Sequence, residues 1–206
     1  MQIPYEIKPN PPGIDNIGCA STPCQPGLND AVLTIAEKLG PGLSLRVFPV
    51  MDQVHILNSC ADNVATVTLG GISVYSTYAC YPVITHGDYS IVSAGSPAKP
   101  GEELTAYAFG LGLPDTPVTT VSATPAAGVP VTRPFTISFA GVTALGASHP
   151  DYAGLVGSNA GLYQINFRVP QVPAGLPPCD AQHPSNLTMT VQGTASVDQS
   201  SFCVQP

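Results

Sequence analysis

Short runs in which apolar and polar residues alternate recur along the chain, bounded by glycine and proline. Residues 135–139 read Phe-Thr-Ile-Ser-Phe, the pattern of a strand with one buried face. In residues 104–110 both alternating sets carry apolar groups, as expected for a central strand of a sandwich. Residues 33–39 have some helical character, but the run ends at Gly40-Pro41 and fits a strand better. The pattern predicts an all-β chain.

Further strands follow from the same pattern. Residues 111–132 are predicted to form a loop and an edge strand, and Gly70-Gly71 signals a two-residue hairpin turn. About seven strands fall within residues 82–206, the number expected of an immunoglobulin-like sandwich. The other predicted strands are 31–35, 43–47, 53–57, 65–69, 72–76, 83–85, 90–92, 162–169, 186–191 and a closing strand around 202–204.

One order of elements occurs twice. Residues 161–170 (GLYQINFRVP) are followed by a Pro/Gly-rich bend and the strands at 186–191 and 202–204. The N-terminus repeats this order from Ile3-Pro4 onward, without the strands that should come before it. An incomplete sandwich exposes unpaired strand edges. We therefore expect the missing strands to come from upstream sequence or from a neighbouring chain.

These observations divide the chain into three segments. Residues 1–50 are predicted to be the C-terminal strands of a truncated module. Residues 51–95 are predicted to form a connector, with a hairpin bracketed by Cys60 and Cys80. Residues 96–206 are predicted to form a complete module, and the strands within residues 82–95 could belong to that module as well.

Charge and hydropathy exclude several classes of protein. The net charge is −7, with 6 Lys and Arg against 13 Asp and Glu, which argues against a nucleic-acid partner. No apolar run is long enough for a membrane-spanning helix. The first residues have neither a basic start nor an apolar stretch, so we expect any secretion signal to lie outside this chain.

The six cysteines fall into three local pairs, and no pair has the CxxC spacing of a zinc or redox site. Six cysteines allow 15 pairings, and the alternative of buried free thiols stays open. Pairing between nearest neighbours predicts three disulfides and an oxidising compartment. The pairs are Cys19 with Cys24, Cys60 with Cys80, and Cys179 with Cys203.

Two segments resemble a known family. Residues 96–112, which contain Ser-Pro-Ala-Lys-Pro-Gly-Glu and then Tyr-Ala-Phe-Gly-Leu-Gly, are similar to a module at the C-termini of large secreted acidobacterial proteins. Residues 161–170 are similar to the same module, and residues 2–7 and 52–57 resemble the end of its first copy and the connector between copies. The family is an uncharacterised TIG/IPT-like, immunoglobulin-like β-sandwich, usually in two tandem copies. The resemblance implies secretion and no known activity or cofactor.

Catalytic and metal-binding patterns are weak. The four histidines are His55, His86, His149 and His183, and Ser158 is the nearest imitation of a nucleophile elbow, without a Gly-x-Ser-x-Gly motif. His86-Gly87-Asp88 and His149-Pro150-Asp151 pair an imidazole with a carboxylate, but in turns, where such residues usually cap backbone amides. Calcium at Asp62 or Asp151 would be favoured over zinc. We expect no enzyme, no metal and no cofactor.

Two features bear on sugars. Asn186-Leu187-Thr188 matches a glycosylation acceptor, although a structural role for Asn186 is the better interpretation. There is no Trp, so an aromatic sugar-binding platform would depend on tyrosines. The candidates are Tyr75, Tyr78, Tyr81, Tyr89 and Tyr152.

The sequence therefore predicts a secreted, non-enzymatic structural or adhesive protein of the cell surface or extracellular space. Its partner would be another copy of itself or the remainder of a larger protein, with strand complementation of the incomplete module as the means of assembly. The alternative is a carbohydrate-binding module of a larger secreted protein, with a polysaccharide as partner.

Overall fold

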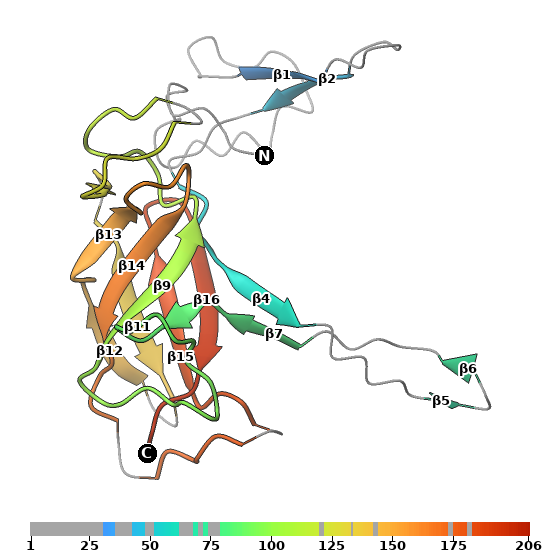
Figure 1. The fold of residues 1–206 in the computed structure, drawn as a ribbon, viewed down its shortest axis with the longest axis vertical. Coiled ribbons are helices and arrows are strands. Elements are labelled where there is room, and N and C mark those ends of the chain that lie inside the picture. Colours follow the sequence, from blue (N-terminus) through green and yellow to red (C-terminus); the bar gives the residue numbers. More distant parts are fainter. Residues whose placement is uncertain are drawn as a thin grey trace.

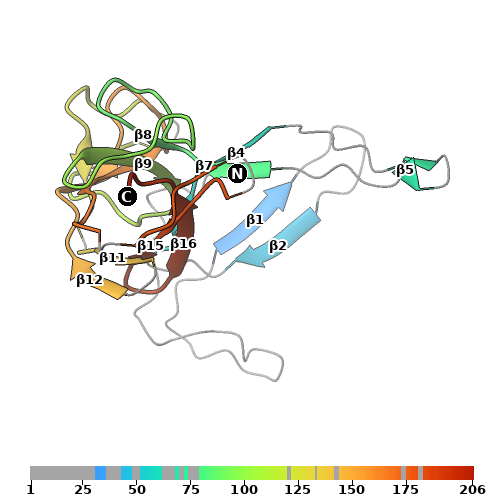
Figure 2. The same cartoon turned by 90° about the horizontal axis from the view of Figure 1, so that it is seen from below.

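Two antiparallel sheets face each other in the computed structural model of this chain (Figures 1 and 2), which contains no helix in its described residues. The alternation of apolar and polar residues predicted this all-β sandwich, and the prediction is confirmed. The described residues are 31–35, 43–47, 52–61, 68–69, 72–73, 79–119, 122–132, 134–141, 144–172, 175–180 and 183–206.

The first sheet has the strand order β10–β13–β14–β9–β3, and β8 also pairs with β9. β9 is an interior strand of this sheet, paired with β14 on one side and with β3 and β8 on the other, as the apolar groups on both faces of residues 104–110 predicted. The bounds are β3 (His55–Ile56), β8 (Ile84–Thr85), β9 (Glu103–Phe109), β10 (Val129–Pro130), β13 (Tyr152–Leu155) and β14 (Tyr163–Arg168).

The second sheet has the strand order β12–β11–β15–β16. Its strands are β11 (Thr136–Ala140), β12 (Ala144–Ser148), β15 (Leu187–Gln192) and β16 (Val197–Phe202). Together the two sheets have the connectivity β8–β9–β14–β13 and β12–β11–β15–β16. This is the order A-B-E-D and C′-C-F-G of immunoglobulin-type sandwiches, with β10 added at the edge beside β13.

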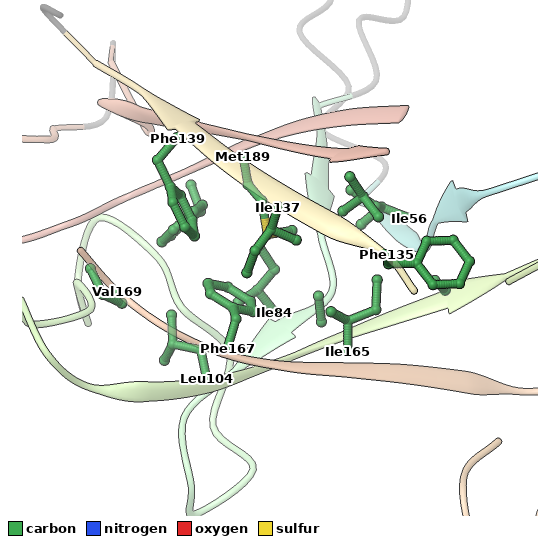
Figure 3. Packing of buried hydrophobic residues seen from close by; sticks show 14 of the residues in the cluster. Ile56, Ile84, Leu104, Phe135, Ile137, Phe139, Ile165, Phe167, Val169 and Met189 are labelled. Carbon is green, nitrogen blue, oxygen red and sulfur yellow. The ribbon is translucent and has the colours of Figure 1, made fainter. Parts of the chain in front are cut away.

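Alternate residues of both sheets fill the space between them (Figure 3). Phe135, Ile137 and Phe139, predicted as the buried face of their strand, are all buried. From the facing sheet, Phe167 packs its ring 5.7 Å from that of Phe139 and 6.0 Å from that of Phe202. Burial of such large apolar side chains supplies most of the stability of a sandwich.

The strand at the edge of the first sheet is interrupted by an insertion. The Leu57 N–H bonds to the Tyr107 carbonyl at 2.8 Å, and the Tyr107 N–H bonds to the Val83 carbonyl at 3.1 Å, so β3 and β8 continue one another along β9. A bond of 2.7 Å from the Val83 N–H to the Leu57 carbonyl closes the gap between them. The insertion, residues 58–82, is here called the arm, and its described strands lie outside the two sheets of the sandwich (Figure 1).

In the arm the structure describes two short antiparallel strand pairs. At its base β4 (Asn58–Ala61) pairs with β7 (Ala79–Pro82), and at its tip β5 (Thr68–Leu69) pairs with β6 (Ile72–Ser73). Leu69 is opposite Ile72, which confirms the hairpin predicted from Gly70-Gly71.

Residues 52–57, predicted to lie in a connector, contribute to the core of the sandwich through Val54 and Ile56. Gly110, at a φ of 71°, makes their approach to β9 feasible, since any side chain there would collide with the Gln53 carbonyl. Asp52 fixes the start of this segment. Its buried carboxylate accepts hydrogen bonds from Thr194 N, Ala195 N and Ser196 Oγ.

In the first segment, β1 (Ala31–Ile35) and β2 (Leu43–Val47) form an antiparallel pair with the predicted bounds. The other residues of 1–50 lie outside the described part of the chain, so the predicted half-module is described only through this hairpin. The closing strand predicted around 202–204 begins earlier, at Val197.

Candidate functional site

A cleft of about 470 Å³ opens at the base of the arm. One wall comes from the arm and another from the turn after Ile91. The third comes from the loop after Cys179 and from the end of β16. The lining residues are Ser59, Tyr81, Pro82, Ile91, Val92, Ser93, Ala94, Gly95, Asp180, Pro184, Ser201, Phe202 and Cys203.

The cleft presents apolar groups that a sandwich would ordinarily bury. Tyr81 is 37% exposed and Ile91 is 47% exposed. Serine hydroxyls and the carboxylate of Asp180 lie among them. The site therefore offers apolar faces and hydrogen-bonding groups together, the usual composition of a small-molecule pocket.

A disulfide braces one wall of the cleft. Cys179 and Cys203 are bonded, with their Cα atoms 6.0 Å apart, as predicted from nearest-neighbour pairing. In the loop beyond it, Asp180 Oδ1 accepts a hydrogen bond of 2.7 Å from the His183 N–H. The opposite wall is a tight turn in which Ser93 and Ser96 exchange backbone hydrogen bonds.

Beside that turn lies a cluster of His86, Glu102 and Ser96. His86 Nδ1 is 2.6 Å from Glu102 Oε1, and His86 Nε2 is 3.2 Å from the Ser96 carbonyl and 3.4 Å from Ser96 Oγ. Glu102 Oε2 accepts a bond of 2.7 Å from the Lys99 N–H. The hairpin from β8 through Val92 brings the cluster together, because His86 N bonds to the Ser90 carbonyl and Val92 N to that of Ile84.

The electrostatics favour a charged pair. Burial opposes the charge on His86, but the bond to Glu102, the Ser96 carbonyl, and the negative charges of Glu102 and Asp88 raise its pKa above 6.5. Burial likewise opposes the charge on Glu102. The bonds from His86 and the Lys99 N–H, with the nearby positive charges, nevertheless hold its pKa below 4.5.

The cluster resembles a Ser-His-acid triad in its contacts but lacks the features that make one reactive. The imidazole Nε2 is closer to the Ser96 carbonyl than to the hydroxyl, so a protonated ring donates to both of its acceptors. The Ser96 N–H bonds to the Ser93 carbonyl, and the next residue, Pro97, has no N–H to offer an oxyanion. The arrangement holds the loop between β8 and β9 in place.

Asn186 takes a structural position. Its Nδ2 donates to the carbonyls of Pro177 and Val204, both at 2.7 Å, and its Oδ1 accepts from the Val204 N–H at 2.8 Å. The nitrogen to which a glycan would be attached is thus engaged in tying the loop before β15 to the chain after β16.

The other predicted site residues are dispersed. The β4–β7 register places Cys60 opposite Cys80, and Cys19, Cys24, Asp62, Tyr75 and Tyr78 lie outside the described residues. His55 pairs with Phe109 across the edge of the first sheet, and His149 Nδ1 lies 3.2 Å from the Phe135 carbonyl. Asp151 contacts Arg168, Ser158 occupies a turn at a φ of 62°, and Tyr152 donates to the Leu155 carbonyl.

Of the three tyrosine candidates that the structure describes, only Tyr81 lies in the cleft, and Tyr89 is 78% exposed outside it. Within the described ranges, no three His, Cys, Asp or Glu side chains group as metal ligands. The same ranges include no helix with the length and apolar character to cross a membrane.

Comparisons with protein-family models, with curated proteins and with solved structures find no match to this chain.

Proposed function

We propose that this protein is a non-enzymatic structural or adhesive module of the extracellular space, related to the immunoglobulin-like family it resembles, and that it assembles by accepting a β-strand from a second copy of the chain. The observation that carries the proposal is the pairing of β1 and β2. In the described residues these two strands pair only with each other.

The complete sandwich shows what such a hairpin requires. β15 and β16 occupy the same place in the second copy of the repeat, and β15 pairs with β11 on its other side over five residues. β1 also spans five residues, but no counterpart of β11 pairs with it in the described part of the chain.

An isolated two-stranded hairpin is at best marginally stable in water. Its outer edges carry unpaired N–H and C=O groups that can template another strand. Strand addition satisfies these groups with main-chain hydrogen bonds and adds apolar contacts. A strand donated to β1 would thus supply what β11 supplies to β15.

The disulfide supports an extracellular setting. Cys179–Cys203 is formed in the structure, and such bonds persist mainly in oxidising compartments. The acidic balance of the chain supports solubility at a surface or in a matrix.

The test is the particle size of the full chain under oxidising conditions, measured by light scattering across protein concentrations. We expect oligomers whose size grows with concentration. Neighbouring residues of a strand direct their N–H groups to opposite edges, so Val32→Pro and Leu33→Pro each remove a donor from a different edge of β1. The variant that alters the edge of β1 facing away from β2 should abolish oligomers while β1 still pairs with β2. Val197→Pro, at the exposed start of β16, is the control for the effect of a proline in another strand.

A wild-type chain that stays monomeric at all concentrations would contradict the proposal. So would oligomers that survive both proline variants of β1.

A further inference from the structure

The cleft at the base of the arm plays no part in strand pairing by β1. It lies where the arm meets the sandwich, between β7, the turn after Ile91 and the end of β16. Its volume of about 470 Å³ falls within the range of roughly 300–1,000 Å³ usual for ligand pockets.

The lining combines two kinds of surface. The Tyr81 ring, Ile91 and Pro184 provide apolar faces, and Ser59, Ser93 and Ser201 provide short hydroxyl side chains. A sugar ring has the matching composition, with C–H groups on its faces and hydroxyls around its edge. Tyrosine suits such a ligand because an apolar ring and a polar tip occur in one side chain.

Charge narrows the ligand class further. Among the described lining residues, Asp180 carries a negative charge and none is Lys or Arg. The His183 ring lies 3.3 Å from the Asp180 carboxylate. The chain as a whole carries a net charge of −7. Phosphorylated, sulfated or uronic-acid ligands would be repelled, whereas the hydroxyl groups of a neutral sugar can donate hydrogen bonds to a carboxylate.

The walls are held before any ligand arrives. The Cys179–Cys203 disulfide fixes the loop carrying Asp180 to the end of β16, and paired backbone bonds fix the turn at 93–96. The arm is anchored at Leu57 and Val83. A preformed site avoids much of the entropy lost on binding.

We infer that this cleft binds a neutral saccharide, with Tyr81 stacking on a sugar ring and Asp180 accepting hydroxyl hydrogen bonds. The inference does not rest on strand complementation, since none of the residues that carry it lies in β1 or β2.

The test uses the full oxidised chain in native affinity electrophoresis through gels containing one soluble polysaccharide each. The neutral probes are β-glucan, α-glucan, xylan, galactomannan and hydroxyethyl chitin, and alginate is the anionic probe. We expect at least one neutral polymer, but not alginate, to retard the protein. Isothermal titration with oligosaccharides of that polymer then gives the affinity.

Two tyrosine variants form a matched pair. Tyr81→Ala should weaken binding roughly tenfold or more, because truncation of a central aromatic contact removes a large share of binding energy. Tyr89→Ala, at a tyrosine outside the cleft, should leave binding unchanged. Asp180→Asn, which keeps the shape of the side chain, should weaken binding less than Tyr81→Ala, and thermal melts of each variant check the fold.

Failure of every neutral polymer to retard the protein would overturn the inference, as would equal losses in the two tyrosine variants. Retardation by alginate alone would also overturn it. Assembly is tested separately by particle size, so a failure of strand complementation and a failure of saccharide binding can be told apart.

Discussion

Two hairpins in this chain, β1–β2 and β15–β16, have the same place in the repeat that the sequence predicts, but the structure describes different surroundings for them. The hairpin β15–β16 is held from three directions, by β11 and the core, by the Cys179–Cys203 disulfide and by the Asp52 carboxylate at its turn. For β1–β2 the described residues show the pairing of the two strands and nothing beyond it. Removing the three supports of β15–β16 one at a time measures how much this hairpin depends on its neighbours.

The largest effect should come from the core. Phe202 of β16 is 2% exposed and packs its ring on Phe167, so Phe202→Ala should lower the free energy of unfolding by about 3–5 kcal/mol. Chemical denaturation measures the loss. Val197→Ala on the same strand, at a side chain that is 58% exposed, should change stability by less than about 0.5 kcal/mol. Similar losses in the two variants would mean that β16 is not held by the core.

The disulfide should rank next. Cys179 and Cys203 are 24 residues apart in sequence, and the loop between them contains the hairpin. A cross-link that closes a loop of this length stabilises the folded protein by about 3 kcal/mol, because it lowers the entropy of the unfolded chain. The double variant Cys179→Ser/Cys203→Ser should show this loss in denaturation. Reduction of the wild-type protein provides the comparison, and a double variant as stable as the oxidised protein would contradict the prediction.

The carboxylate of Asp52 should contribute somewhat less. Asp52→Ala leaves the Thr194 and Ala195 N–H groups without their acceptor, and the loss of such charged hydrogen bonds costs about 2–3 kcal/mol. Hydrogen exchange should accelerate most at the turn between β15 and β16. Asp52→Asn keeps one oxygen acceptor and should recover part of the loss, whereas uniform acceleration across both sheets would argue against a local role.

The smallest effect should come from the His86–Glu102 pair, which supports a loop and neither hairpin. Because the pKa of folded His86 lies above 6.5, its contribution is complete below pH 6.5 and is lost as pH rises through the folded value. Because the pKa of folded Glu102 lies below 4.5, its contribution is complete above pH 4.5 and is lost as pH falls through the folded value. The pair thus stabilises most between pH 4.5 and 6.5.

His86→Gln should remove this dependence at a cost of about 1 kcal/mol within that window. Thermal melts of wild type and variant across pH 4 to 9 give the difference curve. A difference that stays constant with pH would show that the ion pair contributes nothing.

Strong alternation made much of the fold predictable. The buried side chains of β11 and the bounds of β1 and β2 follow directly from sequence, because each strand keeps large apolar groups on one face. β12 (ALGAS) and β13 (YAGL) escaped prediction because small residues give little contrast between faces. Only the apolar end of β16 follows from the sequence, because the first five residues of the strand, Val-Asp-Gln-Ser-Ser, are mostly polar and mostly not buried.

The candidate sites were harder to foresee, because tertiary structure assembles them. Glu102 is 16 residues from His86 and meets it only through the hairpin after β8. Asp52 contacts a turn more than 140 residues away. The Cys179–Cys203 bond was predictable because the two cysteines are neighbours among the six. Tyr81 was one of five tyrosine candidates, and the sequence could not single it out because the cleft around Tyr81 is formed by the arm and β16 together.

The neck of the arm has a consequence for how this protein can change. Leu57 and Val83 are hydrogen-bonded to each other and remain in register along β9, so the sheet is the same whatever lies between them. A change in the length of the segment alters the closure entropy of the loop only slowly, because that entropy grows slowly with length. The position is thus a natural grafting point, where a lineage or an engineer can exchange one projecting element for another and reshape one wall of the adjoining cleft while leaving the sandwich intact.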